Sequence, residues 1–116
     1  MSENELTKDA DYMLCALYKS YLNRRESGIN KSNAKTFGSS VDIHDTLMKE
    51  WNLEDVEETC KELSRAQYIS CSPYNNLSCI ITLSDKAIIY MENRFERKVS
   101  KIVDYMSKIK SVIPFV

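Results

Sequence analysis

One histidine and four cysteines are the residues most able to carry chemistry in this 116-residue sequence. His44 has Met48 one helical turn away, whereas its nearest carboxylates, Asp42 and Asp45, lie off that helical face. Catalytic and metal sites need several reactive groups in a fixed pattern, and the sequence contains no H-E-x-x-H, no C-x-x-C and no glycine-flanked nucleophile. We therefore expect a structural role for His44, and no enzyme activity, catalytic residue, bound metal or cofactor.

The cysteines are scattered along the chain, at Cys15, Cys60, Cys71 and Cys79. This scatter favours buried, reduced thiols in a reducing compartment. Cys71 and Cys79 could instead form a disulfide or a redox sensor, because they fall on the two strands of a predicted hairpin. We expect both to be small apolar core residues, since neither strand supplies the basic neighbours that activate a thiol.

Length and composition limit the class of protein. The chain is 43% hydrophobic and contains two glycines and two prolines. These values predict a single, mostly helical domain over residues 1–116 with a true apolar core. No stretch approaches the roughly 18 apolar residues of a membrane span, and the N-terminal residues are acidic, the reverse of a signal peptide. We expect a cytoplasmic protein that does not bind a membrane.

The spacing of apolar residues predicts the secondary structure. Steps of three and four residues predict a helix over 10–25, a short second helix from about 39 to 50, and a third helix that starts after Asn52. The capping residues agree, because Ser39 and Asp42 form a capping box and Asn52 and Ser84 are good N-caps. The segment between residues 29 and 40 is rich in Ser and Asn and is predicted to be a loop.

A β hairpin is predicted after Gln67, where the apolar period changes from about 3.6 to 2. The predicted turn contains Pro73 and residues 74–76. We expect Ile69 opposite Ile81 and Cys71 opposite Cys79, with all four side chains on one buried face.

A single long helix is predicted over residues 84–113, after a core domain over 10–83. From Phe95 onward its apolar residues recur in an unbroken heptad pattern. This helix is longer than a domain of this size needs to cover its own core, so we expect its apolar seam to form the interface of a homodimer. The seam consists of Phe95, Val99, Ile102, Met106, Ile109 and Ile113.

Residues 61–91, KELSRAQYISCSPYNNLSCIITLSDKAIIYM, resemble part of a winged-helix domain. In that family a recognition helix ends in L-x-x-x-G-Y-I, two strands form the wing, and L-T/S-x-K-G/A opens the following helix. Gln67 takes the place of the usual glycine. The resemblance covers residues 10–91 and is similar to bacterial proteins of the MarR and PadR type and to small YjcQ-like proteins. The matching residues are Leu63, Tyr68, Ile69, Leu83, Ser84, Lys86 and Ala87.

The resemblance implies a mostly α fold with a small β hairpin, a winged helix-turn-helix of order α-α-α-β-β-α with a long C-terminal helix. It also implies double-stranded DNA as the partner and a role as a bacterial transcriptional regulator, with the third helix in the major groove. We place the expected nucleic-acid contacts on the basic residues before the second helix and on the third helix. They are Arg24, Arg25, Lys31, Lys35, Lys61 and Arg65.

The distribution of charge favours an alternative partner. The totals are balanced, at 16 basic and 17 acidic residues, but residues 1–66 hold 9 basic and 13 acidic residues. Duplex DNA would repel the start of the predicted third helix, because four carboxylates gather there. The alternative is a winged-helix adaptor that does not bind DNA and docks a basic protein through this helix. The four acids are Glu54, Asp55, Glu57 and Glu58.

Overall fold

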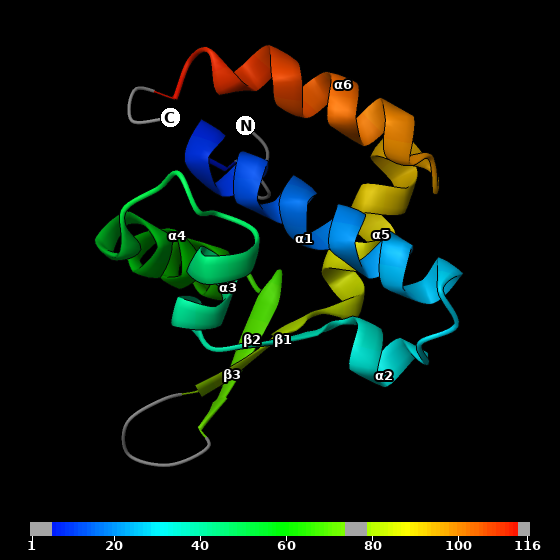
Figure 1. Ribbon diagram of the computed structural model, residues 1–116, viewed down its shortest axis with the longest axis horizontal. Coiled ribbons are helices and arrows are strands. Elements are labelled where there is room, and N and C mark those ends of the chain that lie inside the picture. Colours follow the sequence, from blue (N-terminus) through cyan, green and yellow to red (C-terminus); the bar gives the residue numbers. More distant parts are fainter. Residues whose placement is uncertain (1–5, 74–78, 114–116) are drawn as a thin grey trace.

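The computed structural model describes residues 6–73 and 79–113 of the chain. These residues form a mostly helical fold with one small antiparallel sheet, which confirms the predicted fold class at that level. Figure 1 shows the sheet beneath α1, with α6 on the other side of that helix. The elements are α1 (Lys8–Glu26), α2 (Lys31–Ala34), β1 (Thr36–Gly38), α3 (Ser40–Thr46), α4 (Leu53–Arg65), β2 (Ile69–Pro73), β3 (Cys79–Leu83), α5 (Asp85–Phe95) and α6 (Val99–Lys110).

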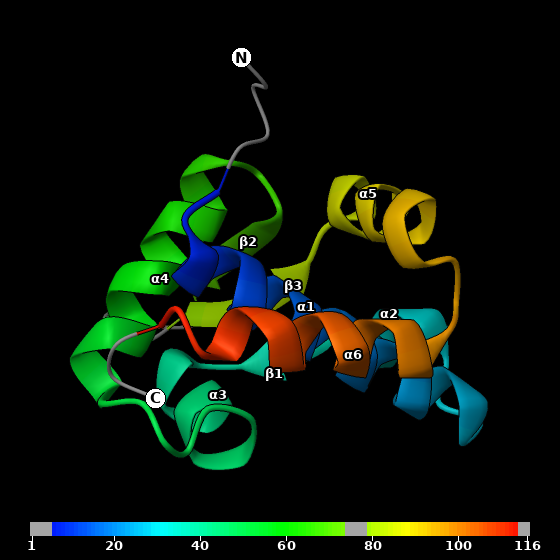
Figure 2. The ribbon, with the colours of Figure 1, turned by 90° about the horizontal axis from the view of Figure 1, so that it is seen from above.

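Helix α1 is the centre of the core. Leu14, Leu17 and Tyr18 are fully buried on it, and ten of its residues in all are buried. α6 lies along α1 in both ribbon views (Figures 1 and 2), and α4 and α5 also pack against it. A helix covered on several sides needs apolar residues beyond one stripe, which is why α1 is so rich in them.

The predicted helix starts are confirmed at three caps. Ser39 and Asp42 form the expected capping box, in which Asp42 Oδ2 accepts from Ser39 N at 3.0 Å. Asn52 Oδ1 accepts from Asp55 N at 2.9 Å at the start of α4. Ser84 Oγ accepts from Ala87 N at 3.1 Å at the start of α5. Each cap satisfies a backbone donor that the first helical turn cannot pair internally.

A Schellman motif ends α4 and turns the chain into β2. The N–H of Tyr68 donates to Leu63 O at 2.9 Å and the N–H of Gln67 donates to Ser64 O at 3.0 Å. This geometry requires a left-handed residue at Gln67, whose φ is 66°. Glycine adopts that conformation without strain, which gives a physical reason for the glycine that the resemblance expects at this position.

The predicted loop between residues 29 and 40 contains two elements that the sequence pattern missed. Asn30 Oδ1 accepts from Asn33 N at 2.9 Å and caps the short helix α2. β1 then pairs with β3, so the sheet order is β1-β3-β2. The N–H of Leu83 also donates to Lys35 O at 2.8 Å, just before β1. β1 depends on its pairing with the distant strand β3, whereas α2 has a local cap but is only four residues long, too short for an apolar pattern to reveal.

The hairpin is confirmed, but its register differs from the predicted one by two residues. Ile69 pairs with Leu83, Cys71 pairs with Ile81, and Pro73 pairs with Cys79. The observed register places Leu83, which is fully buried, opposite Ile69. A shift of two residues leaves every side chain on its expected face, so the apolar pattern could not distinguish the two registers. Residues 74–76 of the predicted turn lie outside the described residues.

The prediction of one long helix over 84–113 is wrong. α5 ends at Phe95, Glu96 takes a left-handed φ of 57°, and α6 starts at Val99. Tyr18 OH donates to Glu96 O at 2.6 Å and holds this turn against α1. The break lets the seam fold onto its own chain, where Phe95, Ile102, Ile109 and Ile113 are buried and Val99 and Met106 are half-buried.

This burial removes the reason for expecting a dimer along the seam, because the seam residues are already covered by the chain itself. A homodimer therefore remains a prediction, but the buried seam gives no support for it.

None of the helices in the described residues is both long and apolar enough to cross a membrane.

Candidate functional site

The six predicted nucleic-acid contacts lie at two separate places in the fold. Arg24, Arg25, Lys31 and Lys35 lie at the end of α1 and around α2, and we call them the basic end. Lys61 and Arg65 lie on α4. Figures 1 and 2 show α2 and α4 on opposite sides of the molecule. The structure therefore does not bring the six residues together on one element or in one cleft.

Arg24 of the basic end has a structural role. Its Nη1 atom donates to Thr36 O at 2.7 Å and to Ala34 O at 3.3 Å. The guanidinium also lies 4.5 Å from the centre of the Phe37 ring. These contacts hold the end of α1 against α2 and β1, so the guanidinium of Arg24 is bound by groups of its own chain.

Lys31 and Lys35 share one carboxylate. Asp85 Oδ1 lies 3.3 Å from Lys35 Nζ and 3.6 Å from Lys31 Nζ. The hydrogen bond and charge of Lys35, together with the charge of Lys31, lower the pKa of Asp85 below its ordinary value. This ion pair partly neutralises the basic end, although it is exposed and therefore weak.

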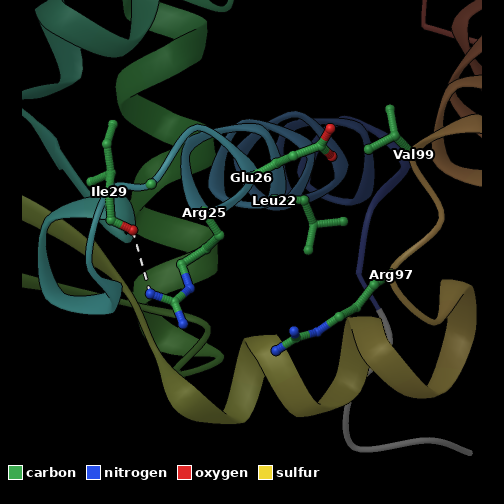
Figure 3. A pocket seen from close by; sticks show the side chains of 7 residues that line it. Leu22, Arg25, Glu26, Ile29, Arg97 and Val99 are labelled. Carbon is green, nitrogen blue, oxygen red and sulfur yellow. Dashed lines mark hydrogen bonds between the residues drawn. The ribbon is translucent and has the colours of Figure 1, made fainter.

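Arg25 lines an open pocket of about 380 Å³ beside the turn between α5 and α6. Figure 3 shows Arg25 and Arg97 extending into the same space from α1 and from that turn. Arg25 Nη1 donates to Ile29 O at 3.3 Å, and Arg97 Nε lies 3.2 Å from Glu92 Oε2. Each guanidinium therefore has an acceptor from its own chain.

Helix α4 presents the opposite charge. Glu54, Glu57 and Glu58 are exposed on it, and we call these three residues the acidic face. Within residues 6–73 and 79–113, no Lys, Arg or His nitrogen lies within 4.0 Å of their carboxylates. Glu62 differs, because it accepts from Thr7 N at 2.9 Å and from Thr7 Oγ1 at 2.7 Å.

Further carboxylates crowd the neighbourhood of the acidic face. Burial and the nearby charges of Asp55 and Glu62 raise the pKa of Asp9, at the start of α1. Burial, with a smaller effect of Glu57, raises the pKa of Cys60 to about 11. The carboxylates gathered here create a negative potential, and a cationic partner would be attracted to it.

A groove of about 460 Å³ separates α4 from the β hairpin. Ile69 and Ile81 form apolar walls, while Glu57 and Lys61 contribute charge from α4. We call it the hairpin groove. The complete lining is Ser40, Glu57, Cys60, Lys61, Ser64, Ile69, Cys71, Cys79 and Ile81. The sequence pattern did not predict this groove, because it arises from the packing of two distant elements.

The expectation of four buried thiols is wrong for two of them. Cys71 and Cys79 form a disulfide, with their Cα atoms 5.4 Å apart. Cys71 is exposed and Cys79 is half-buried. Cys15 and Cys60 are free and buried, as predicted. The two-residue register shift makes Cys71 and Cys79 diagonal rather than direct neighbours, and this distance still suits a disulfide.

His44 is half-buried and bridges the segment between α3 and α4. Its Nδ1 atom lies 2.8 Å from Asp45 Oδ1 and its Nε2 atom lies 2.8 Å from Trp51 O. Asp45 lies off the helical face of His44, but its carboxylate still reaches the imidazole because adjacent side chains at a helix end can bend toward each other. In the part of the chain that the structure describes, no group of three potential metal ligands is present.

A buried ion cluster joins α1, α5 and α6. Arg94 Nη1 lies 2.7 Å from Asp11 Oδ1, and Tyr105 OH donates to Asp11 Oδ2. The Arg94 guanidinium also lies 4.7 Å from the Phe95 ring centre. Burial alone would lower the pKa of Arg94, but the hydrogen bond and charge of Asp11 raise it above its ordinary value. This cluster links three helices, and its residues do not line any of the pockets described above.

Comparisons with protein-family models, with curated proteins and with solved structures found no match. The basic end, the acidic face and the hairpin groove are therefore the surfaces from which a function can be inferred.

Proposed function

We propose that this protein is a winged-helix interaction module that docks a basic polypeptide segment on the acidic face of α4 and in the adjoining hairpin groove. The order of helices followed by a hairpin supports a winged-helix assignment, with α3 and α4 as the helix-turn-helix pair. Such domains serve both DNA readers and protein adaptors, so the surface decides between these functions.

The observation that carries the proposal is the unequal use of charge on the two sides of the molecule. At the basic end, Arg24 binds backbone carbonyls and Lys31 and Lys35 lie beside Asp85. Among the described residues, the carboxylates of Glu54, Glu57 and Glu58 have no comparable partner. A surface with uncompensated negative charge attracts a positively charged partner and repels duplex DNA.

The hairpin groove suits the side chain of a lysine or arginine. Its apolar walls, Ile69 and Ile81, can cover the aliphatic part of such a side chain, and Glu57 lies in the same lining to receive the charge. The hairpin groove therefore provides a specific binding position for one basic side chain, in addition to the negative charge of the acidic face.

Titration with a fluorescein-labelled peptide of alternating lysine and alanine tests the proposal. The test variant is E54Q/E57Q/E58Q, which keeps side-chain size and removes three charges. The control variant is E26Q/D104N, which removes exposed carboxylates of α1 and α6. We expect the affinity at low salt to fall about tenfold or more in the test variant and much less in the control.

The two variants also define the result that would reject this function. Losses in proportion to the charges removed, three in the test variant and two in the control, would show that net charge alone attracts the peptide. Absence of peptide binding to the wild type at low salt would reject a basic partner for the acidic face.

Duplex DNA is the second candidate partner, because α4 would be the recognition helix of a winged-helix domain and exposes Lys61 and Arg65 four residues apart. Titration with random duplex DNA at about 50 mM salt measures this function. If DNA binds, affinity should rise steeply as salt falls, and K61Q/R65Q should reduce the slope by about two. Failure to bind DNA under these conditions would remove this candidate.

A further inference from the structure

The Cys71–Cys79 disulfide lies at an accessible place on the hairpin. Cys71 belongs to β2 and is exposed, whereas Cys79 belongs to β3 and is half-buried. Both residues line the hairpin groove. An incoming thiolate can therefore reach the Cys71 sulfur more easily than the Cys79 sulfur, and access is one of the factors that determine which sulfur is attacked.

The fold does not depend on this disulfide for its core. The nearest apolar core residues of the hairpin are Ile69, Ile81 and Leu83, which are buried against the rest of the chain. The disulfide closes a short segment, with a sequence separation of 8 residues. Opening it therefore leaves the core contacts and the strand pairing in place, so the reduced chain can remain folded.

The other two cysteines are protected from the same chemistry. Burial raises the pKa of Cys15 to about 12 and that of Cys60 to about 11. Cys15 is 0% exposed, so neither a reagent nor a thiolate reaches it in the folded chain. Cys60 is 8% exposed where it lines the hairpin groove, and its raised pKa keeps it mostly in the weakly reactive thiol form. The chain thus combines one accessible disulfide, one fully buried thiol and one thiol of low reactivity.

We propose that Cys71 and Cys79 form a reversible thiol–disulfide exchange site whose substrates are small thiols and their disulfides. In the reducing direction, a thiolate attacks the Cys71 sulfur, the bond to Cys79 breaks, and Cys79 leaves as a thiolate that takes up a proton. A second thiolate then attacks the small-molecule sulfur of the mixed disulfide, the bond to Cys71 breaks, and Cys71 leaves as a thiolate that takes up a proton while the oxidised small molecule is released. The reverse sequence, with oxidised glutathione as oxidant, restores the disulfide.

Exchange at this site changes the wall of the hairpin groove. In the oxidised chain the two strands are tied together beside Glu57 and Lys61 of α4. In the reduced chain this covalent cross-link is absent, and the ends of β2 and β3 nearest the hairpin turn are held together by backbone hydrogen bonds alone. The exchange chemistry does not rest on the proposed partner, so it stands even if the acidic face binds something else.

Thiol counting in glutathione buffers tests the proposal on the full chain. The protein is equilibrated with defined ratios of reduced and oxidised glutathione, and accessible thiols are modified with a maleimide polymer without denaturant. We expect no rapid modification in oxidised glutathione and two modified cysteines in reduced glutathione. Circular dichroism should show the same helical fold in both buffers.

Single variants identify the attacked sulfur. C79S leaves the exposed Cys71 thiol, so we expect it to form a mixed disulfide with glutathione about tenfold or more faster than C71S, which leaves the half-buried Cys79. The folded double variant C71S/C79S serves as the control and should accept neither glutathione nor maleimide.

Hydrogen exchange reports the consequence for the hairpin. On reduction, amides of residues 69–72 and 79–83 should exchange about tenfold or more faster, while amides of α1 should not change. Two results would overturn the proposal. The first is a pair of thiols that stays reduced in oxidised glutathione. The second is a disulfide that glutathione reduces only when the protein is unfolded.

Discussion

The buried ion cluster and the acidic face use the same kind of charged side chain in opposite ways. Asp11 of the cluster lies 2.7 Å from Arg94 and also accepts from Tyr105. Glu54, Glu57 and Glu58 of the acidic face are exposed and, among the described residues, lie beyond 4.0 Å of any cationic nitrogen. One set of carboxylates joins three helices, and the other is directed outward.

The difference indicates which charges maintain the fold and which are available for a partner. Removing one member of a buried pair leaves an uncompensated charge and costs about 3–5 kcal/mol, whereas exposed charges contribute about 0–1 kcal/mol. Charges that contribute little to folding can be changed without loss of the fold. The acidic face therefore meets the physical requirement for a functional surface.

The largest effect on stability is expected from Arg94→Met, which leaves the Asp11 carboxylate without its cationic partner. Because the side chain of Arg94 is still 23% exposed, we expect the free energy of unfolding to fall by about 2–4 kcal/mol. Urea denaturation measures this change. The control is Arg97→Met, which removes the exposed pair with Glu92 and should cost less than about 1 kcal/mol. Equal effects of the two variants would contradict the distinction between buried and exposed charge.

A smaller effect of opposite sign is expected from Gln67→Gly at the end of α4. Gln67 has a φ of 66°, and its backbone bonds do not require a side chain. Glycine removes the left-handed strain but increases the entropy of the unfolded chain, so we expect a net gain of about 0.5 kcal/mol in urea denaturation. A clear loss of stability would show that the Gln67 side chain makes a contribution that the backbone geometry does not reveal.

A still smaller effect on stability is expected from E54Q/E57Q/E58Q. Removing Glu54 weakens the interaction with the helix N-terminus, while removing three like charges relieves repulsion. These opposing contributions should leave the free energy of unfolding within about 0.5 kcal/mol of the wild type. A loss of several kcal/mol would assign the acidic face to the fold and not to a partner.

The smallest effect is expected from the protonation of His44, which should make the stability depend weakly on pH. The hydrogen bond to Asp45, with a further one to Trp51 O, raises the pKa of His44 above its ordinary value of 6.5. The stabilising effect of the imidazolium is therefore fully present below pH 6.5 and disappears as pH rises through the folded-state pKa. NMR titration should place the His44 pKa above 6.5, and the stability difference from His44→Gln should shrink as pH increases. A pKa at or below 6.5 would contradict this contact.

Local signals accounted for much of the fold. Ser39, Asn52 and Ser84 cap the helices that the apolar spacing predicted, because a cap involves residues only three positions apart. Such interactions are contained within a few residues, so they can be recognised in the sequence.

Features that depend on distant residues were missed or misplaced. The break at Glu96 needs Tyr18, 78 residues away, and the heptad pattern continues across it without interruption. β1 exists because β3 supplies its partner. Likewise, the sequence indicated the acidic residues of α4 but not the hairpin groove. Arg24 was predicted to contact DNA, because the sequence does not show that its guanidinium donates to the carbonyl oxygens of Ala34 and Thr36.

NMR chemical-shift mapping with the alternating lysine and alanine peptide tests the central claim most directly. The peptide is added to the ¹⁵N-labelled full chain, and a parallel titration uses random duplex DNA. We predict that the peptide shifts the amides of residues 54–64 of α4 and of the strands that line the hairpin groove, and that DNA has little effect there. Shifts confined to the basic end, or a stronger response of α4 to DNA than to the peptide, would contradict the account.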